Sequence, residues 1–130
     1  MLISRLRKKP GIAVVTPEST EDLWILRRIL KSGDVITSHT KRVIKNQKEF
    51  TRPDKGERIT VKLSVQLEKI SIDQVLERIR ISGKITETTD ESISKGSYHA
   101  MNITLGNSIV ISKKIFEGFQ IGLLKKRVKA

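Results

Sequence analysis

The sequence predicts a mainly β domain: a small, strongly bent sheet or barrel, with one short helix in its N-terminal half and another at its C-terminal end. The first observation is the run 59–68, in which apolar and polar side chains alternate strictly, as in a strand with one buried face. The second is a series of short β-branched runs of even spacing that follows a single helical stretch. With 130 residues, 37% of them hydrophobic, the chain suffices for one core but not for two full-sized domains.

The chain begins with a strand and a helix. Residues 11–16 (GIAVVT) form a β-branched run, and the residues before them are expected to pair with them as a hairpin. Leucines at helical spacing then predict a helix over residues 20–31, with Ser19 as its N-cap and Gly33 as its stop. The ring of Trp24 is expected to pack against the sheet from this helix.

The middle of the chain is expected to form two strands joined by a long loop. Residues 35–44 lack helical periodicity and are rich in β-branched side chains. Residues 46–57 contain Pro53, Gly56 and many charges, which predicts an exposed loop. Strand alternation then divides the next run into a buried set and a more exposed set. The buried set is Ile59, Val61, Leu63, Val65 and Leu67, and the exposed set is Lys62, Ser64 and Gln66.

The C-terminal half is expected to add strands, a turn and a helix. One strand extends from Val75 through Ile85. The dipeptide Gly106-Asn107 is expected to form a two-residue hairpin turn that pairs the strands on either side of it. In the tail, a four-residue spacing of apolar side chains predicts a short helix within 113–130, and this segment is expected to lead into another domain. The apolar positions are Ile115, Phe119 and Leu123.

The net charge of +12 points to a polyanionic partner. Three basic segments carry it: residues 1–10 hold four Lys and Arg and no acid, 41–58 hold seven against three acids, and 113–130 hold six against one. No apolar run approaches the roughly 18 residues of a membrane span. The chain begins with charge too early for a signal peptide, so a soluble cytoplasmic protein without a membrane partner is expected.

The basic segment in the middle of the chain is the strongest candidate for binding RNA. Lysine and arginine neutralise phosphates without reading sequence, and an aromatic ring among them can stack on a base. A solvated, mobile insertion is the alternative. The candidate RNA-binding residues are Lys41, Arg42, Lys45, Lys48, Phe50, Arg52, Lys55 and Arg58.

Catalytic chemistry has little support in the sequence. There is no cysteine, and no phosphate-binding glycine loop, nucleophile elbow or zinc spacing is present. His39 is a weak catalytic candidate because basic residues follow it, whereas His99 shares a strand face with apolar residues and is expected to be structural. Glu87, Asp90 and Glu91 could offer oxygen ligands to a divalent metal, although solvated turn carboxylates are the more common case. Whether the protein is an enzyme therefore stays open.

Several motifs, taken in order, resemble a known family. They are Glu21-Asp22-Leu23-Trp24, Leu30, Gly33-Asp34, the long basic segment, the alternating strand, and Gly96-Ser97-Tyr98-His99 ahead of Gly106-Asn107. Together they resemble the N-terminal domain of Pelota, the archaeal and eukaryotic paralogue of class-I release factors. The resemblance covers essentially the whole chain and implies a small Sm-like barrel, the first domain of a longer three-domain protein.

The resemblance also implies a function. Pelota enters the empty A site of a stalled ribosome with an elongation-factor-like GTPase, and helps an ABC-type ATPase to separate the subunits. Its N-terminal domain lies in the decoding region, where the basic loop approaches mRNA and small-subunit rRNA. The Asn-Ile-Lys-Ser motif of release factors is absent, so stop-codon reading is not expected. The partners implied are thus the ribosome and these two nucleotide hydrolases, for a protein that is otherwise monomeric.

Two alternatives remain at this stage. The first is a divalent-metal-dependent endoribonuclease that cleaves stalled mRNA in no-go decay, an activity ascribed to this family; a metal cofactor is expected only in that case. The second is a generic Sm-like RNA-binding protein. The richness in Ile and Lys and the lack of Cys would suit an archaeal source.

Overall fold

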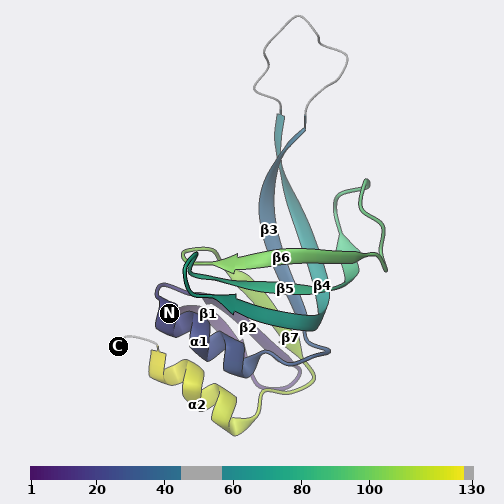
Figure 1. Ribbon diagram of the computed structural model, residues 1–130. Helices are drawn as coiled ribbons and strands as arrows, with labels where there is room; N and C mark the ends of the chain where they lie inside the picture. The colour runs from purple at the N-terminus through teal and green to yellow at the C-terminus, as the bar shows by residue number, and fades with distance from the viewer. Residues whose placement is uncertain (45–56, 128–130) are drawn as a thin grey trace, which may run out of the picture.

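The computed structural model describes residues 1–44 and 57–127, with side chains described outside residues 40–60. Within these residues, seven antiparallel strands form one sheet in the order β1-β2-β7-β3-β4-β5-β6, and two helices lie together beside it (Figure 1). The elements are β1 Leu2–Arg7, β2 Gly11–Thr16, α1 Thr20–Ile29, β3 Val35–Ile44, β4 Glu57–Asp73, β5 Arg78–Thr88, β6 Tyr98–Thr104, β7 Ile109–Lys113 and α2 Gly118–Arg127. The predicted mainly β class, the hairpin before residue 16 and both helices are confirmed.

The sheet is strongly bent around one main core. The register of β4 against β5 shifts twice, between Ser64 and Val65 and between Leu67 and Lys69, and such irregularities bend a strand. One hydrophobic cluster therefore contains side chains from strands near both ends of the sheet, such as Val15 of β2 and Ile103 of β6. The barrel is not closed, because the described strands form no ladder between β1 and β6.

Helix α1 follows the predicted cap and apolar face. The Ser19 hydroxyl accepts a hydrogen bond from the Asp22 N–H at 3.4 Å, as an N-cap residue does. Leu23 and Leu26 are fully buried, and Gly33 after the helix has a φ of 97°, a conformation that glycine adopts without strain. Trp24 lies at the margin of the buried face and keeps 41% of its surface exposed, so its ring is only partly covered.

The alternation of β4 is confirmed with one exception. Four of its five predicted core side chains are buried, namely Val61, Leu63, Val65 and Leu67; the side chain of Ile59 lies outside the described residues. Gln66 is exposed and the Lys62 side chain keeps 43% of its surface exposed, so both are more exposed than the core set, as expected. Ser64 was predicted to be exposed and is only 2% exposed, because its hydroxyl pairs with that of Thr37 on β3 at 2.7 Å. A buried hydroxyl with a partner carries little penalty.

The prediction that Val75 belongs to a strand is wrong. Val75 is 90% exposed and lies in the turn between β4 and β5. The Asp73 carboxylate accepts hydrogen bonds from the N–H groups of Val75 and Leu76, both at 3.0 Å, which closes an Asx turn. Strand β5 begins only at Arg78, after Glu77 with a φ of 49°.

The prediction of a hairpin at Gly106-Asn107 is also wrong. The chain turns there, but β6 pairs with β5, whereas β7 pairs with β2 and β3. The Gly106 N–H donates to the carbonyl of Pro17 at 2.8 Å, which ties the turn to the end of β2. The dipeptide determines a local turn, whereas the pairing of the strands depends on the whole sheet.

Helix α2 buries a different face from the one the apolar spacing predicts. Phe119 is 59% exposed and Ile115 is 38% exposed, whereas Gln120 and Leu124 are buried. The Gln120 amide donates to the carbonyl of Ile29 at 3.2 Å and accepts from the Glu117 N–H at 2.8 Å. This polar side chain is buried because it satisfies both the end of α1 and the start of α2.

A buried ionic cluster attaches the end of α2 to α1 and to the start of the chain. The Asp22 carboxylate, with its side chain 1% exposed, lies 3.0 Å from the α-amino group of Met1 and 2.7 Å from Nε of Arg127. Burial by itself raises the pKa of Asp22, but hydrogen bonds from the Glu18 N–H, from Arg127 and from the α-amino group outweigh it. The pKa of this carboxyl is therefore lowered below its ordinary value.

Asp22→Asn should reduce stability at neutral pH by about 3 kcal/mol, because the buried α-amino group of Met1 and the partly exposed Arg127 lose the buried carboxylate that they share and keep the more exposed Glu18 and Glu21. In the parent chain the unfolded state protonates Asp22 below roughly pH 4, whereas the folded state resists protonation, so this stabilisation is lost as the pH falls through the lowered pKa. The free energy of unfolding, measured with denaturant between pH 7 and pH 3, should fall less with decreasing pH in the variant than in the parent chain. Glu18→Gln is the control, since that half-exposed carboxylate, 3.0 Å from the same amine, should contribute less than about 1 kcal/mol.

Two glycine substitutions should have opposite effects on stability. A Cβ at Gly83 of β5 would lie 1.8 Å from the backbone oxygen of Gln66, so Gly83→Ala should displace β4 and cost about 3 kcal/mol or more. A Cβ at Gly122 of α2 meets nothing within 4 Å, so Gly122→Ala should stabilise the helix by roughly 0.5–1 kcal/mol. Urea denaturation measures both. Equal effects of the two substitutions would show that the close approach of β4 to β5 is wrong.

Candidate nucleic-acid interface

Strands β3 and β4 extend beyond the rest of the sheet as a two-stranded arm (Figure 1). They pair over ten positions, from Val35 opposite Gln66 to Ile44 opposite Glu57. Strand β7 pairs with β3 only as far as Ser38, and β5 pairs with β4 only from Leu63 onward. About six residues of each strand therefore continue as a pair, roughly 20 Å at about 3.3 Å per residue.

Three of the predicted RNA-binding residues are positions of the paired strands that form this arm. Lys41 and Arg42 belong to β3, opposite Thr60 and Ile59, and Arg58 belongs to β4, opposite Val43. The strands thus bring positions from both ends of the basic segment to the same arm. The other predicted residues, Lys45, Lys48, Phe50, Arg52 and Lys55, lie outside the described residues, so their role in binding stays a prediction.

A polar groove of about 610 Å³ lies at the base of the arm, on one face of the sheet. Four of its nine lining residues carry hydroxyl groups, each from a different one of four neighbouring strands. The hydroxyls of Thr37 and Ser64 are buried and pair with each other, whereas those of Thr86 and Ser112 can donate to phosphate oxygens and can donate to or accept from ribose hydroxyls. The residues that line it are Val35, Thr37, His39, Lys62, Ser64, Thr86, Glu87, Val110 and Ser112. The sequence alone did not predict this groove. The sequence does carry Ser and Thr at alternate positions of its strands, which could have indicated a polar face. Only the order of the strands in the sheet shows that these residues lie next to one another.

One ion pair lies within the groove. The Lys62 ammonium is 3.4 Å from a carboxylate oxygen of Glu87, and the two side chains are 43% and 63% exposed. An ion pair this exposed contributes little to stability. Lys62 can therefore exchange its carboxylate for a phosphate at small cost.

His39, the catalytic candidate of the sequence, lies in the groove, exposed on β3 opposite Lys62. Within the described part of the chain no hydrogen bond orients its ring, and a catalytic role for it stays a prediction. His99 is half-buried on β6, opposite Gly83.

The carboxylates considered as metal ligands are not brought together either. Glu87 pairs with Lys62, and Asp90 accepts hydrogen bonds from the N–H and hydroxyl of Ser92 at 2.9 and 2.6 Å. Glu91 is exposed in the same loop as Asp90. Across residues 1–44 and 57–127, no group of three His, Asp or Glu side chains could hold a metal ion. None of the described helices is long and apolar enough to cross a membrane.

Comparison with known proteins identifies the family. A family model described as the Pelota N-terminal domain matches residues 2–128. The chain belongs to the Pelota N-terminal domain family. It is 46% identical over 111 residues to the pelota homolog of Nitrosopumilus maritimus, covering 85% of this chain and 32% of that protein. It is 30% identical over 130 residues to the pelota homolog of Pyrococcus furiosus, covering 100% of this chain and 36% of that protein.

Solved Pelota structures share the fold. An archaeal Pelota from a model of ribosome-bound Pelota and ABCE1 superposes with a TM-score of 0.74 at 32% identity, covering 100% of this chain and 36% of that one. Yeast Dom34, described as a translation termination-like factor that interacts with Hbs1, has a TM-score of 0.71 at 25% identity, covering 97% and 33%. This chain thus spans about one third of the length of its Pelota relatives.

In this Pelota domain, Glu87→Gln should strengthen RNA binding, because it removes the carboxylate that competes with phosphate for Lys62. We expect affinity to rise about twofold to fivefold at low salt, with unfolding free energy unchanged within about 0.5 kcal/mol. Filter binding to single-stranded RNA measures the first and urea denaturation the second. Glu77→Gln, which removes the same charge beyond the opposite end of β5, is the control and should leave affinity unchanged. An equal gain from both variants would mean that only net charge matters.

Proposed function

We propose that this chain is the N-terminal RNA-binding domain of a longer ribosome-rescue factor. It docks in the decoding region of a stalled ribosome, contacts mRNA and small-subunit rRNA through the β3–β4 arm, and promotes dissociation of the subunits without reading a codon. The observation that carries the proposal is the arm itself, a paired ribbon whose strands begin and end the basic segment.

Charge and geometry support this role. The arm lies opposite the helices, so its contacts with RNA leave the core undisturbed (Figure 1). The groove at its base supplies hydroxyls and Lys62, which suit phosphate and ribose. Phosphate contacts of this kind position a protein on RNA without selecting a base sequence, as a factor that acts on any stalled message requires.

The relatives support the proposed partners. An archaeal Pelota has been described bound to the ribosome with ABCE1, and yeast Dom34 is described as interacting with Hbs1. By analogy, an ABC-type ATPase and an elongation-factor-like GTPase would act with the longer protein in the cytoplasm. Residues 1–130 would form one domain of that protein, with α2 near the connection to the next.

Binding rather than cleavage is the proposed activity. The described part of the chain assembles neither three metal ligands nor an oriented His39. Incubating the purified chain with labelled RNA, with and without EDTA, tests this. A cut that survives repurification, requires the divalent metal and disappears in His39→Ala would replace the proposal with the endoribonuclease alternative.

Replacing Lys48, Arg52 and Lys55 together with Ala should weaken binding to single-stranded RNA. If each contacts a phosphate, the slope of log affinity against log salt should become shallower by roughly two units, because each contact releases less than one counterion. Preference among RNA sequences should stay unchanged. Filter binding at several salt concentrations and a thermal melt measure binding and fold.

The matched control is Lys69→Ala/Arg80→Ala/Lys95→Ala, which removes the same charge from exposed positions on β4, β5 and the β5–β6 loop. A Lys48/Arg52/Lys55 variant with an intact fold and the parent salt slope would show that RNA does not bind through these three residues.

A further inference from the structure

Two of the three basic segments, far apart in sequence, lie side by side in the fold. Strand β2 pairs with β7 so that Gly11 lies opposite Lys113. The Phe116 N–H then donates to the carbonyl of Lys8 at 3.0 Å. Phe116 is fully buried, and a Cβ at Gly11 would lie 2.8 Å from its ring, so glycine is what lets the ring fit under the strand. The turn between β1 and β2 is therefore held against the segment that leads into α2.

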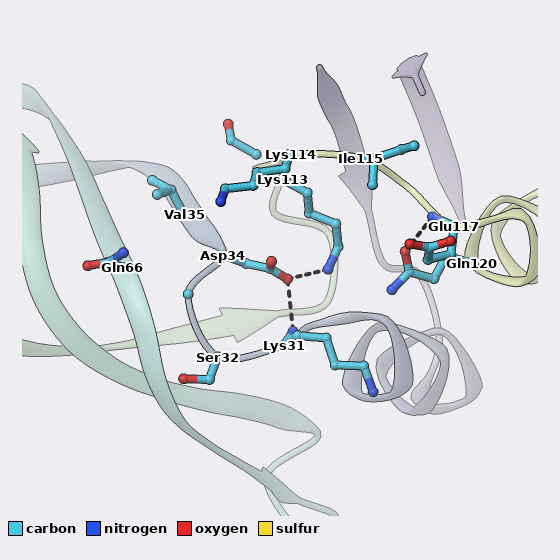
Figure 2. A pocket seen from close by; sticks show the side chains of 12 residues that line it. Lys31, Ser32, Asp34, Val35, Gln66, Lys113, Lys114, Ile115, Glu117 and Gln120 are labelled. Carbon is cyan, nitrogen blue, oxygen red and sulfur yellow. Dashed lines mark hydrogen bonds and ion pairs between the residues drawn. The ribbon is translucent and has the colours of Figure 1, made fainter. Parts of the chain in front are cut away.

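Four exposed cations lie in the two segments that meet at this junction, and we call them the basal cluster: Arg7, Lys8, Lys9 and Lys114. Lys114 lines a cavity of about 730 Å³, and Lys31 lines the same cavity with its ammonium turned away from that of Lys114 (Figure 2). The Lys31 backbone N–H donates to the Asp34 carboxylate at 2.8 Å, which fixes the end of α1 beside β7.

The carboxylate nearest the basal cluster does not cancel its charge. Asp34 is paired with the Lys113 ammonium, which also donates to the carbonyl of Ile29 at 2.9 Å (Figure 2). The Lys113 side chain is only 5% exposed, so this pair is internal and neutral. Glu117 is the other carboxylate that lines the cavity, and it leaves a clear excess of exposed positive charge.

The basal cluster lies at the opposite end of β3 from the arm. Val35, the first residue of β3, pairs with Ser112 next to Lys113, whereas the arm ends at Ile44. A strand of ten residues is roughly 30 Å long. The cluster and the tip of the arm are thus too far apart to bind the same few nucleotides.

The chemistry of the two regions also differs. The basic segment 41–58 includes an aromatic residue, Phe50, and aromatic residues among cations are typical of surfaces that bind single strands. In the two stretches that carry the basal cluster, residues 7–9 and 113–116, the aromatic side chain is Phe116, which is buried; the exposed Phe119 lies further along, on α2. Cations without stacking partners suit the regularly spaced phosphates of a duplex, which proteins recognise by shape.

We infer that the basal cluster is a second RNA-binding surface, which binds the phosphate backbone of double-stranded RNA. The inference rests on the proposed RNA-binding role and adds a separate site to it. One domain would thereby hold a single strand with the arm and a neighbouring duplex with the basal cluster.

The test compares two triple variants on two RNA probes. One variant is Lys8→Ala/Lys9→Ala/Lys114→Ala, and the other is the arm variant with Lys48, Arg52 and Lys55 replaced by Ala. The probes are a blunt RNA duplex of roughly 16 base pairs and one of its strands alone. The basal variant should lose duplex affinity, with a salt slope shallower by roughly two to three units, and keep its affinity for the single strand. The Lys48/Arg52/Lys55 variant should lose affinity for the single strand and keep its affinity for the duplex.

Two control variants separate charge from structure. Lys8→Arg/Lys9→Arg/Lys114→Arg keeps the charge and should retain duplex binding. Lys69→Ala/Arg80→Ala/Lys95→Ala removes equal charge elsewhere and should also leave duplex binding unchanged. All variants should have the same melting temperature, because every substituted position outside residues 45–56 is exposed.

Several outcomes would overturn the inference. Unchanged duplex binding in the basal variant would refute it, while loss of single-strand binding in the arm variant would leave the proposed function standing. Loss of both probes to the same degree in the basal variant would refute the assignment to duplex RNA. Polyglutamate that displaces the duplex at equal charge concentration would favour an acidic protein surface instead. If neither triple variant weakened either probe, both the inference and the proposed function would fail.

Discussion

The side chain of Asp34 connects the segments on which both candidate RNA surfaces depend. Its carboxylate binds the buried ammonium of Lys113 at the end of β7 and accepts the Lys31 N–H from the end of α1. The backbone carbonyl of Asp34 accepts a hydrogen bond from the Leu67 N–H at 2.7 Å, in the bulged part of β4. A buried ion pair contributes little net stability, but loss of one partner is costly because it strands a charge. The pair therefore fixes how helix, arm and tail meet.

Two strands connect this junction to the two basic regions of the molecule. Strand β3 begins beside Asp34 and continues into the arm, and β7 ends there and leads through Lys114 toward α2. The core between them is ordinary aliphatic packing, with Ile36, Ile81 and Ile111 fully buried. Because these side chains hold the sheet without help from surface charges, cations can gather at its ends without weakening the fold.

The helices have a different role. Helix α1 covers the core with leucines, whereas α2 adds Leu124 to the core and is also held by polar contacts of Gln120 at its start and Arg127 at its end. Such contacts require defined geometry, so they orient α2 more narrowly than an apolar stripe would. Phe119 remains exposed on α2.

What the sequence by itself determined were the local features. Periodicity identified α1 and the alternation of β4, and composition located the three basic segments, because these depend on neighbours a few residues apart. The tertiary structure decided which strands pair across the sheet. It placed β7 between β2 and β3 despite the turn at Gly106-Asn107, and it buried Ser64 against Thr37. It also formed the groove from four strands and brought Lys8 beside Phe116. These contacts join residues tens of positions apart, and no short-range pattern encodes them, since strand order follows from how the whole chain buries its apolar faces.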